Sequence, residues 1–476
     1  METLARAANR GSVSTGYDID NSLKLEIDNT EYITRTNASA GNSKTFTFSG
    51  WYKFTELFSG DGPSLFEIYG TGPLKYFSIY MYQYTLIFYD YLGGVDYGKQ
   101  TTQVFRDTSA WYHIVLSVDT TDATAADRMK LYINGTRVTA FNTDFGDPPQ
   151  NFDTQANKSS MANRIGYSAA LSGIYYSGYV SEVNFVDGQA LAPTDFGEFD
   201  ADTGIWKPIE TNISSYGTNG FQLKFDNASD LGEDASGGSS FTLNNITSAD
   251  QATDTPTNNF CIQSSVIDFR QRQPVTTFAV NGGTSSSDTS SNSWRGVMCT
   301  MGVTSGKWYW EVKYNDVDDQ RAGVHTFTGD VGSNTNPQAI DNFWGLYGGD
   351  GSGCYWTSQI DGVGTSNSAN RGNVIGGGSI IGVALNLDDD ELSFYINGSS
   401  GGANVSNIDI STLTAAGNPL IPMINLYRNT MQTNFGGFSG FTISTGNTDE
   451  NGYGNFEYAP PSGYYALCSK NLAEFG

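Results

Sequence analysis

The sequence predicts an all-β fold, with two β-sandwiches in tandem joined by a loop-rich connector. The 476 residues include 56 Gly and 13% aromatic side chains, whereas charged residues make up only 16%. This composition favours strands and tight turns over helices. The aromatic side chains also supply enough apolar surface to build a core. Short apolar alternations recur between turn residues along most of the chain, which is typical of sandwiches.

The first sandwich is expected over residues 23–210, after an extended polar arm at residues 1–22. Residues 211–259 are rich in Asp, Asn, Ser, Thr and Gly, so we expect them to be the connector. The second sandwich is expected over residues 260–476. The strands predicted from alternation lie at 23–27, 44–53, 86–91, 111–118, 129–134, 179–186, 308–314, 379–387, 391–397 and 431–435.

One strand-and-hairpin unit occurs in both halves. In the first half, a strand ending at Asp119 is followed by one that ends in Asn134 and Gly135. In the second half, a strand ending at Asp388 is followed by one that ends in Asn397 and Gly398. Asn-Gly supplies the two residues with positive φ that a tight type I′ hairpin needs. The repetition predicts two sandwiches of related jelly-roll architecture.

The chain is strongly acidic, with 50 Asp and Glu against 25 Lys and Arg and a formal net charge of −25. Such a charge repels phosphate backbones and argues against nucleic acid as a partner. No apolar run is long enough for a membrane span or a signal peptide, so we expect neither. The four cysteines are far apart in sequence and are expected to be free thiols.

Arg6 and Arg10 lie in the polar arm of this acidic chain. Two guanidinium groups on an extended segment suit an acidic partner surface. We therefore predict that residues 1–22 dock the protein onto other members of an assembly.

Glu26, Asp28 and Glu31 follow the spacing Glu-x-Asp-x-x-Glu. Residues i and i+2 of a strand share a face, and paired carboxylates can hydrolyse glycosidic bonds. However, residues 28–30 read as a turn, which favours a solvated strand end. The two histidines, His113 and His325, have no recognisable nucleophile beside them. We expect that the protein is not an enzyme, with a glycan hydrolase using these three carboxylates as an alternative.

Asp226, Asp230 and Asp234 are the candidate ligands for a calcium ion, a hard cation that prefers several oxygen ligands. They lie in the acidic connector, and none of the acidic segments fits an EF-hand loop. Solvated acidic loops are the competing interpretation. No other cofactor is expected.

Tyrosines are concentrated between residues 69 and 91. Strand alternation would place one set of side chains in the core and leave a row of tyrosines on the other face. Exposed tyrosine rows suit contacts with sugars or protein neighbours. Packing beneath a covering loop is the other interpretation, and both stay open at the level of sequence.

Two parts of the chain resemble known domain families. Residues 23–200 are similar to the laminin-G-like branch of the concanavalin A-like sandwiches, and this branch often carries calcium. Residues 290–436 resemble a SPRY domain, most clearly in Lys-Trp-Tyr-Trp-Glu-Val at 307–312 and in the hairpin at 382–398. The segments that carry the first resemblance lie at 46–51, 111–115, 131–135 and 178–185.

The tandem as a whole is similar to bacteriophage structural proteins of the fibre, tail or head-decoration type. This resemblance implies a protein assembled in the host cytoplasm and displayed on the virion surface for particle assembly and adhesion. The implied partners are other virion proteins, further copies of the chain, with a trimer favoured, and a host-surface glycan or protein. A carbohydrate-binding adhesin of a cell surface stays open. The segments concerned lie at 6–11, 16–23, 106–113, 187–191, 217–221 and 254–259.

Loops of the second sandwich are the expected recognition surface, because binding residues tend to sit on loops that a rigid scaffold holds. SPRY domains bind through loops at one end of the sandwich, which the resemblance implies here. The candidates supply stacking faces and forked donors. They are Tyr347, Tyr355, Trp356, Tyr427 and Arg428, with a core position for Tyr355 and Trp356 as the alternative.

Overall fold

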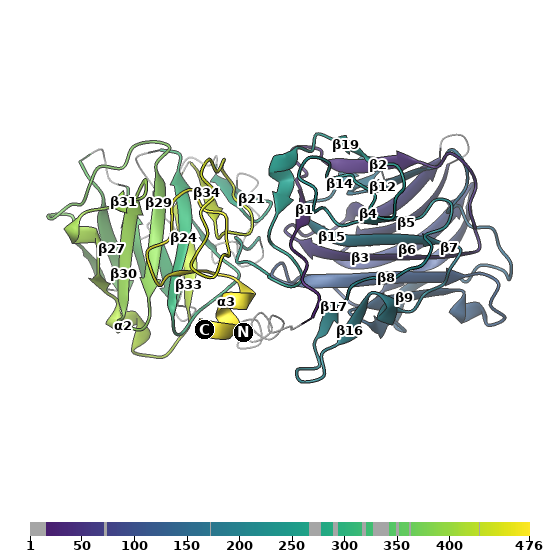
Figure 1. Ribbon diagram of the computed structural model, residues 1–476. Helices are drawn as coiled ribbons and strands as arrows, with labels where there is room; N and C mark the ends of the chain where they lie inside the picture. Colours follow the sequence, from purple (N-terminus) through teal and green to yellow (C-terminus); the bar gives the residue numbers. More distant parts are fainter. Residues whose placement is uncertain are drawn as a thin grey trace. The chain divides into compact units, whose positions relative to one another are not determined.

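The computed structural model of the protein describes residues 16–70, 74–171, 173–265, 278–288, 294–316, 320–326, 342–348, 352–360, 363–427 and 429–476. The fold is nearly all-β, as predicted, and divides into two compact units. We call Ser14–Thr257 the first unit and Asn258–Gly476 the second unit. Figure 1 shows two layers of sheet in each unit. No helix in the described ranges is long and apolar enough to cross a membrane.

The first unit consists of two large antiparallel sheets, which we name after central strands. The β3 sheet has the order β10 (Thr136–Arg137), β9 (Met129–Ile133), β8 (Trp111–Asp119), β3 (Thr45–Phe54), β15 (Gly178–Asp187), β1 (Ser22–Leu25) and β20 (Gln251–Ala252), with β18 (Phe221–Leu223) also on β15. The β5 sheet has the order β11 (Phe141–Gly146), β7 (Val95–Thr101), β6 (Thr85–Leu92), β5 (Lys75–Tyr82), β4 (Asp61–Gly70), β12 (Ala162–Ile165), β2 (Tyr32–Thr36) and β19 (Thr242–Asn244). Two small hairpins join β13 (Tyr167–Ser168) to β14 (Ile174–Tyr175) and β16 (Gly197–Phe199) to β17 (Trp206–Pro208).

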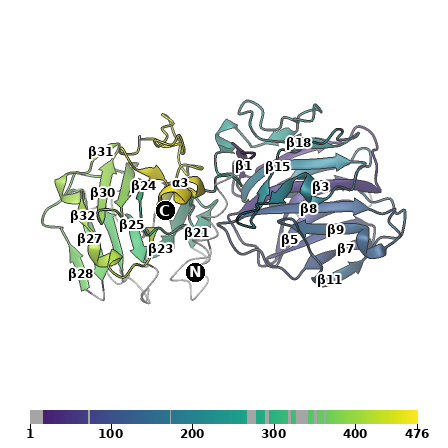
Figure 2. The same cartoon turned by 60° about the horizontal axis from the view of Figure 1, so that its bottom comes forward.

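The core of the first unit lies between the inner faces of these sheets. Alternate residues of β5, Phe77, Ile79 and Met81, are buried in it, as are Phe46 and Phe48 of β3. Figure 2 shows β15, β3, β8 and β9 side by side, in the order that their hydrogen bonds give. The alternation predicted from the sequence therefore places the apolar side chains of both sheets in the core of this sandwich.

The expected connector at 211–259 belongs to the first unit up to Thr257. Its strands β18, β19 and β20 pair with β15, β2 and β1. Its apolar side chains Phe221 and Phe241 are buried in the core with ring centroids 4.7 Å apart. The prediction failed because these strands are only two or three residues long, so turn residues dominate the local composition. We call residues 211–257 the returning segment.

Of the arm expected at residues 1–22, the described part, from Gly16 onward, belongs to the first unit instead. Ile19 is buried, and its N–H donates to Thr257 Oγ1 over 3.0 Å. Ser22 begins β1. Arg6 and Arg10, the predicted docking residues, lie outside the described residues.

The second unit also has two antiparallel sheets. One has the order β21 (Phe278–Asn281), β22 (Ser285–Asp288), β34 (Thr430–Asn434), β24 (Lys307–Tyr314), β29 (Ile380–Asn386), β30 (Glu391–Ile396) and β31 (Ser399–Ser400), with β32 (Ile408–Asp409) on β30 and β35 (Tyr465–Ala466) parallel to β24. The other, which we call the β25 sheet, has the order β23 (Arg295–Met298), β33 (Leu420–Leu426), β25 (Gln320–Thr326), β26 (Phe343–Tyr347), β27 (Tyr355–Ile360) and β28 (Val363–Ser366). Helices α2 (Ser411–Thr414) and α3 (Ser469–Phe475) are short.

The two Asn-Gly hairpins form as predicted. Asn134 and Gly135 have φ of 47° and 74°, and Asn397 and Gly398 have φ of 48° and 76°. Each pair joins two antiparallel strands, β9 to β10 and β30 to β31. The structure thus confirms the shared unit that the sequence predicted in both halves.

The returning segment should be required for the stability of the first unit. Phe241→Ala removes a 3%-exposed ring from the core, so we expect a loss of about 3–5 kcal/mol in the free energy of unfolding. Denaturant titration with tryptophan fluorescence measures it. Phe199→Ala is the matched control, because Phe199 is 53% exposed and should cost less than about 1 kcal/mol. Equal, small effects of the two substitutions would contradict this assignment.

Candidate functional site

A belt of tyrosines covers part of the outer face of the β5 sheet. The core takes Phe77, Ile79 and Met81 of β5, so the alternate residues of this strand face outward. We call the outward set the tyrosine belt: Tyr32, Tyr69, Tyr76, Tyr80, Tyr82, Tyr89, Tyr91, Tyr167 and Tyr175.

The centre of the belt is closely packed. Tyr76 stacks on Tyr91 with ring centroids 5.3 Å apart, and Tyr89 meets the edge of Phe145 at 4.9 Å. Tyr76, Tyr80 and Tyr89 are only 8–9% exposed. Both sequence interpretations are therefore partly right: the central rings are packed, while Tyr69, Tyr82 and Tyr91 at the margins are half-buried.

An ion pair lies in the middle of the belt. Arg164 Nη1 is 3.1 Å from Glu67 Oε2, and the guanidinium carbon is 4.9 Å from the ring centre of Tyr69. Glu67 is fully buried and accepts the N–H groups of Ala169 and Ala170 at 3.0 Å each. Burial raises the pKa of Glu67, although these donors and Arg164 act against the rise. Glu67 thereby fixes the guanidinium group among the rings.

A second aromatic group continues the belt toward β2. The ring centroids of Tyr32 and Tyr167 are 4.8 Å apart, and those of Tyr167 and Tyr175 are 4.7 Å apart. All three side chains are half-buried. Half-exposed rings with hydroxyl groups, next to a fixed guanidinium group, can stack on the apolar face of a sugar and donate hydrogen bonds to it.

The second unit carries an alternating row of aromatic and arginine side chains, which we call the aromatic–arginine ladder. Tyr427 and Trp294 have ring centroids 5.6 Å apart. The guanidinium carbon of Arg321 is 4.9 Å from the ring centres of both Trp294 and Tyr347. Tyr347 then meets Tyr355 at 5.1 Å, and Arg371 lies 4.9 Å from the ring centre of Tyr355.

The ladder includes three of the five recognition residues predicted for this domain, namely Tyr347, Tyr355 and Tyr427. Trp356 points differently: it stacks on Trp344 at 4.7 Å and packs against the core, which was the alternative kept for it. Arg428 lies outside the described residues. Sequence patterns do not single out Trp294, Arg321 and Arg371. These residues are far from the tyrosines in sequence and meet them only through strand pairing and the loop that follows β28.

Asn425 lies next to Arg321 in strand register and is fully buried. Its side-chain amide has no hydrogen-bond partner among the residues that the structure describes. A buried amide without a partner is costly unless a ligand or water completes it. The ladder therefore combines aromatic surfaces with a buried amide and a buried guanidinium group beside them.

Of the three proposed hydrolase carboxylates, Glu31 holds the turn between β1 and β2, and Asp28 is exposed. Glu31 accepts the N–H of Glu26 at 2.7 Å and the amide of Asn29 at 2.8 Å. Glu26 forms an ion pair with the buried Lys24. Burial, with the charge of Asp250, raises the pKa of Glu31 to about 7. This geometry gives Glu31 a structural role. The turn at 28–30 forms as expected, but Glu31 is 2% exposed and is not the solvated strand end that the sequence favoured.

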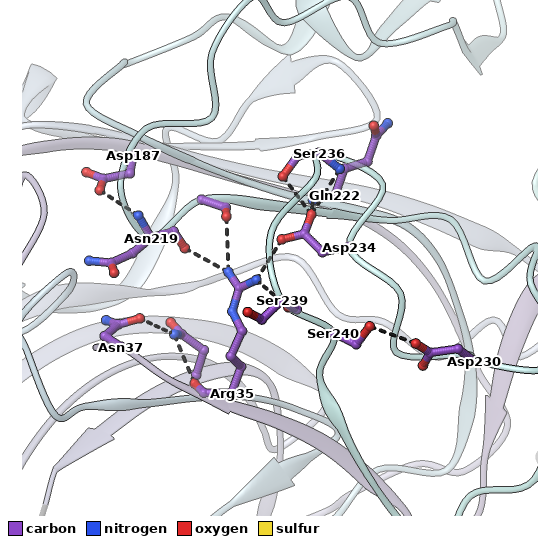
Figure 3. A network of polar contacts seen from close by, with 12 residues as sticks. Arg35, Asn37, Asp187, Asn219, Gln222, Asp230, Asp234, Ser236, Ser239 and Ser240 are labelled. Carbon is purple, nitrogen blue, oxygen red and sulfur yellow. Dashed lines mark hydrogen bonds and ion pairs between the residues drawn. The ribbon is translucent and has the colours of Figure 1, made fainter. Parts of the chain in front are cut away.

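The three candidate calcium ligands are not brought together. Figure 3 shows Asp234 bonded to Arg35, with 2.6 Å between Oδ2 and Nη1, whereas Asp230 accepts the hydroxyl of Ser240 at 2.7 Å. The other oxygen of Asp234 accepts the N–H groups of Gln222 and Ser236, and Asp226 is exposed. Within the described ranges, no group of three or more His, Cys, Asp or Glu could hold a metal ion. The expected calcium site is therefore wrong for these residues.

His113 is buried and satisfied on both ring nitrogens. Trp206 Nε1–H donates to Nδ1 at 3.0 Å, so Nε2–H donates to Ser49 Oγ at 2.8 Å. Burial lowers the pKa of His113 to about 3, so the ring stays neutral. All four cysteines are free and buried, as predicted.

Replacing Glu31 by Gln should change how stability depends on pH. A carboxyl whose folded pKa is raised favours folding below its unfolded pKa, and this contribution is lost as the pH rises through about 7. The variant lacks this loss, so its free energy of unfolding relative to wild type should rise between pH 4.5 and 8. Urea titrations across this range measure the difference, with Glu198→Gln at an exposed position as the control. A difference that stays constant with pH would contradict the structural role.

Two family models match parts of the chain. Residues 28–195 match the concanavalin A-like lectin/glucanases superfamily, and residues 307–438 match the SPRY domain. No curated protein matches the sequence.

Several solved structures are similar over part of the chain. The heptameric SAP-like pentraxin from Limulus polyphemus is 16% identical, with 37% of this chain and 80% of the pentraxin covered and a TM-score of 0.27. A putative carbohydrate binding protein from Bacteroides ovatus is 18% identical, with 50% and 62% covered and a TM-score of 0.32. The SPRY domain of human HERC1 is 15% identical, with 33% and 92% covered and a TM-score of 0.25. From the family matches, the chain carries a concanavalin A-like domain in its first unit and a SPRY domain in its second.

Proposed function

We propose that the protein is an adhesive binding protein whose first unit binds glycans through the tyrosine belt. The observation that carries this proposal is the arrangement of half-buried tyrosines around the Arg164–Glu67 ion pair on one sheet face. Aromatic rings beside fixed polar groups are the usual composition of a small-ligand site. The superfamily matched by residues 28–195 includes lectins, which supports the same assignment.

Binding without catalysis is part of this proposal. The alternative, a glycan hydrolase, needs two carboxylates about 5–10 Å apart on either side of a sugar. Glu31 is instead occupied by the backbone and side chain of its own turn. Glu67, the buried carboxylate of the belt, is held by Arg164 and two backbone N–H groups. Both carboxylates thus have structural partners that catalysis would have to displace.

We also propose which kind of particle displays this adhesive protein, and we call it the carrier. The resemblance to bacteriophage fibre and decoration proteins supports a place on a virion surface, with copies of the chain and other virion proteins as partners. A cell-surface adhesin is the alternative. Both carriers use the same glycan-binding face.

Removing rings at the margin of the belt should weaken glycan binding. We expect Tyr69→Ala and Tyr91→Ala each to raise the Kd by about fivefold, since an aromatic contact contributes about 1 kcal/mol. A glycan array selects the ligand, and calorimetry measures the affinity of folded variants. Phe199→Ala, at an exposed ring off the belt, is the control. Unchanged affinity in both tyrosine variants would contradict the site.

A second candidate function belongs to the SPRY domain, where the aromatic–arginine ladder suits an acidic peptide of a partner protein. Arg321 and Arg371 place guanidinium groups against aromatic rings, on a chain that is otherwise strongly acidic. Arg371 also donates to the carbonyl oxygens of Ser368 and Gly353. The buried amide of Asn425 beside Arg321 adds a donor and an acceptor.

Peptide arrays test this second surface. The wild-type protein should select peptides rich in Asp and Glu, and Arg371→Ala or Tyr427→Ala should reduce that signal at least about fivefold, as loss of a charged or stacking contact predicts. Arg137→Ala is the matched control, because this exposed arginine lies in the first unit. Peptide selection that does not depend on Asp and Glu, or an equal loss of signal in Arg137→Ala, would contradict this second function.

A further inference from the structure

A row of four large side chains crosses the outer face of the β3 sheet. In strand register, Trp111 of β8 lies beside Lys53 of β3, Lys53 beside Tyr179 of β15, and Tyr179 beside Lys24 of β1. Figure 2 shows these four strands as neighbours. Tyr52, the neighbour of Lys53 in the chain, is in the core, so Lys53 points to the opposite face.

The two lysines of this row are fully buried although they are on an outer face. Lys24, Lys53 and Tyr179 are each 0% exposed. The ammonium nitrogens of Lys24 and Lys53 lie 5.4 Å and 5.5 Å from the ring centre of Tyr179. Lys24 is paired with Glu26. Lys53 is thus excluded from water and lies next to an aromatic ring.

Asp254 is placed directly against Lys53 by the end of the returning segment. Its Oδ2 is 2.6 Å from Lys53 Nζ, and its Oδ1 accepts Trp111 Nε1–H at 3.0 Å. The backbone around Asp254 is also fixed, because Ser22 Oγ–H donates to its carbonyl oxygen at 2.6 Å. The two side chains are 0% and 1% exposed.

We propose that Lys53 and Asp254 condense to an intramolecular isopeptide bond, a modification that locks the returning segment to β3. The reacting forms are a neutral amine and a carboxylic acid, which one proton transfer across the 2.6 Å contact makes from the ion pair. A desolvated lysine is a competent nucleophile. The fold holds both groups in contact, so the reaction is intramolecular and proceeds as if each group were present at a very high concentration.

The reaction balances without any further reactant. Lys53 Nζ attacks the Asp254 side-chain carbon, and the negative charge that develops on Oδ1 is stabilised by the indole N–H of Trp111. Oδ2 leaves with two of the three ammonium protons as water, and the third proton remains on the new amide nitrogen. The C–O bond breaks, the C–N bond forms, and no atom is oxidised or reduced. Because the two side chains are 0% and 1% exposed, water has little access to the new amide, and its hydrolysis is slow.

The cross-link would close a loop from β3 to the last residues of the first unit. Pulling on the chain would then be unable to peel the returning segment away from β1 and β15. This inference concerns the scaffold and does not depend on the proposed glycan or peptide sites.

Intact-mass measurement of the denatured, full-length protein tests the proposal directly. The wild-type chain, incubated folded, should be lighter than its sequence mass by one water molecule, and proteolysis should release one branched peptide containing Lys53 and Asp254. A folded Lys24→Met chain is the matched control and should show the same loss. Asp254→Asn should lose ammonia instead of water. Trp111→Phe should form the bond at least tenfold more slowly, because it lacks the indole donor.

A wild-type chain that is folded by circular dichroism and keeps its full sequence mass after prolonged incubation would overturn the proposal. A loss of water whose branched peptide maps elsewhere would also overturn it. Because the decisive measurement uses the wild-type chain, the test does not depend on whether a variant folds.

Discussion

Two ion pairs, one of them fully buried, fasten the returning segment, and the first sandwich depends on them. Arg35 on β2 holds Asp234, and Lys53 on β3 holds Asp254, each with 2.6 Å between the charged atoms. In both pairs one partner lies in the sandwich and the other lies in residues 211–257. Removing one member of a fully buried pair costs about 3–5 kcal/mol, because the other charge is left buried without compensation. This applies to Lys53 and Asp254 before the condensation proposed above. The strands of the returning segment are too short to hold it in place by themselves. The two pairs therefore determine where it lies on the sandwich.

The tyrosine belt depends on the same packing of the returning segment against the sandwich. The returning segment supplies Phe221 and Phe241 to the core, and Arg35, which it surrounds, lies 4.6 Å from the ring centre of Phe241. Strand β2 is thus held between β12 and β19, which keeps Tyr32 beside Tyr167. The ion pair of Arg164 on β12 with Glu67 on β4 then fixes the centre of the belt. Core packing on one face of the sheet positions a binding surface on the other.

The sequence predicts the parts of this fold that local patterns determine. Long alternating strands such as β3, β8 and β24 and the hairpins at Asn134 and Asn397 are specified by neighbours in the chain. The returning segment was mistaken for a connector because its role rests on contacts with β1, β2 and β15, which no local pattern contains. Tyr347, Tyr355 and Tyr427 could be chosen by residue type, whereas Arg321 and Arg371 required the register of the β25 sheet and the loop after β28. The sequence suggests metal ligands at Asp226, Asp230 and Asp234. However, the carboxylate of Asp234 pairs with Arg35, which is about 200 residues away in the chain.

Native-state hydrogen exchange on the intact protein tests most directly whether the returning segment is part of the first sandwich. Amides of β18 and β20 donate into the ladders of β15 and β1, so their opening should require the opening of those strands. The account predicts that these amides exchange with the same free energy as the central amides of β3 and β15. Exchange of β18 and β20 at a much lower free energy, while β3 and β15 stay protected, would show that residues 211–257 are a detachable connector after all.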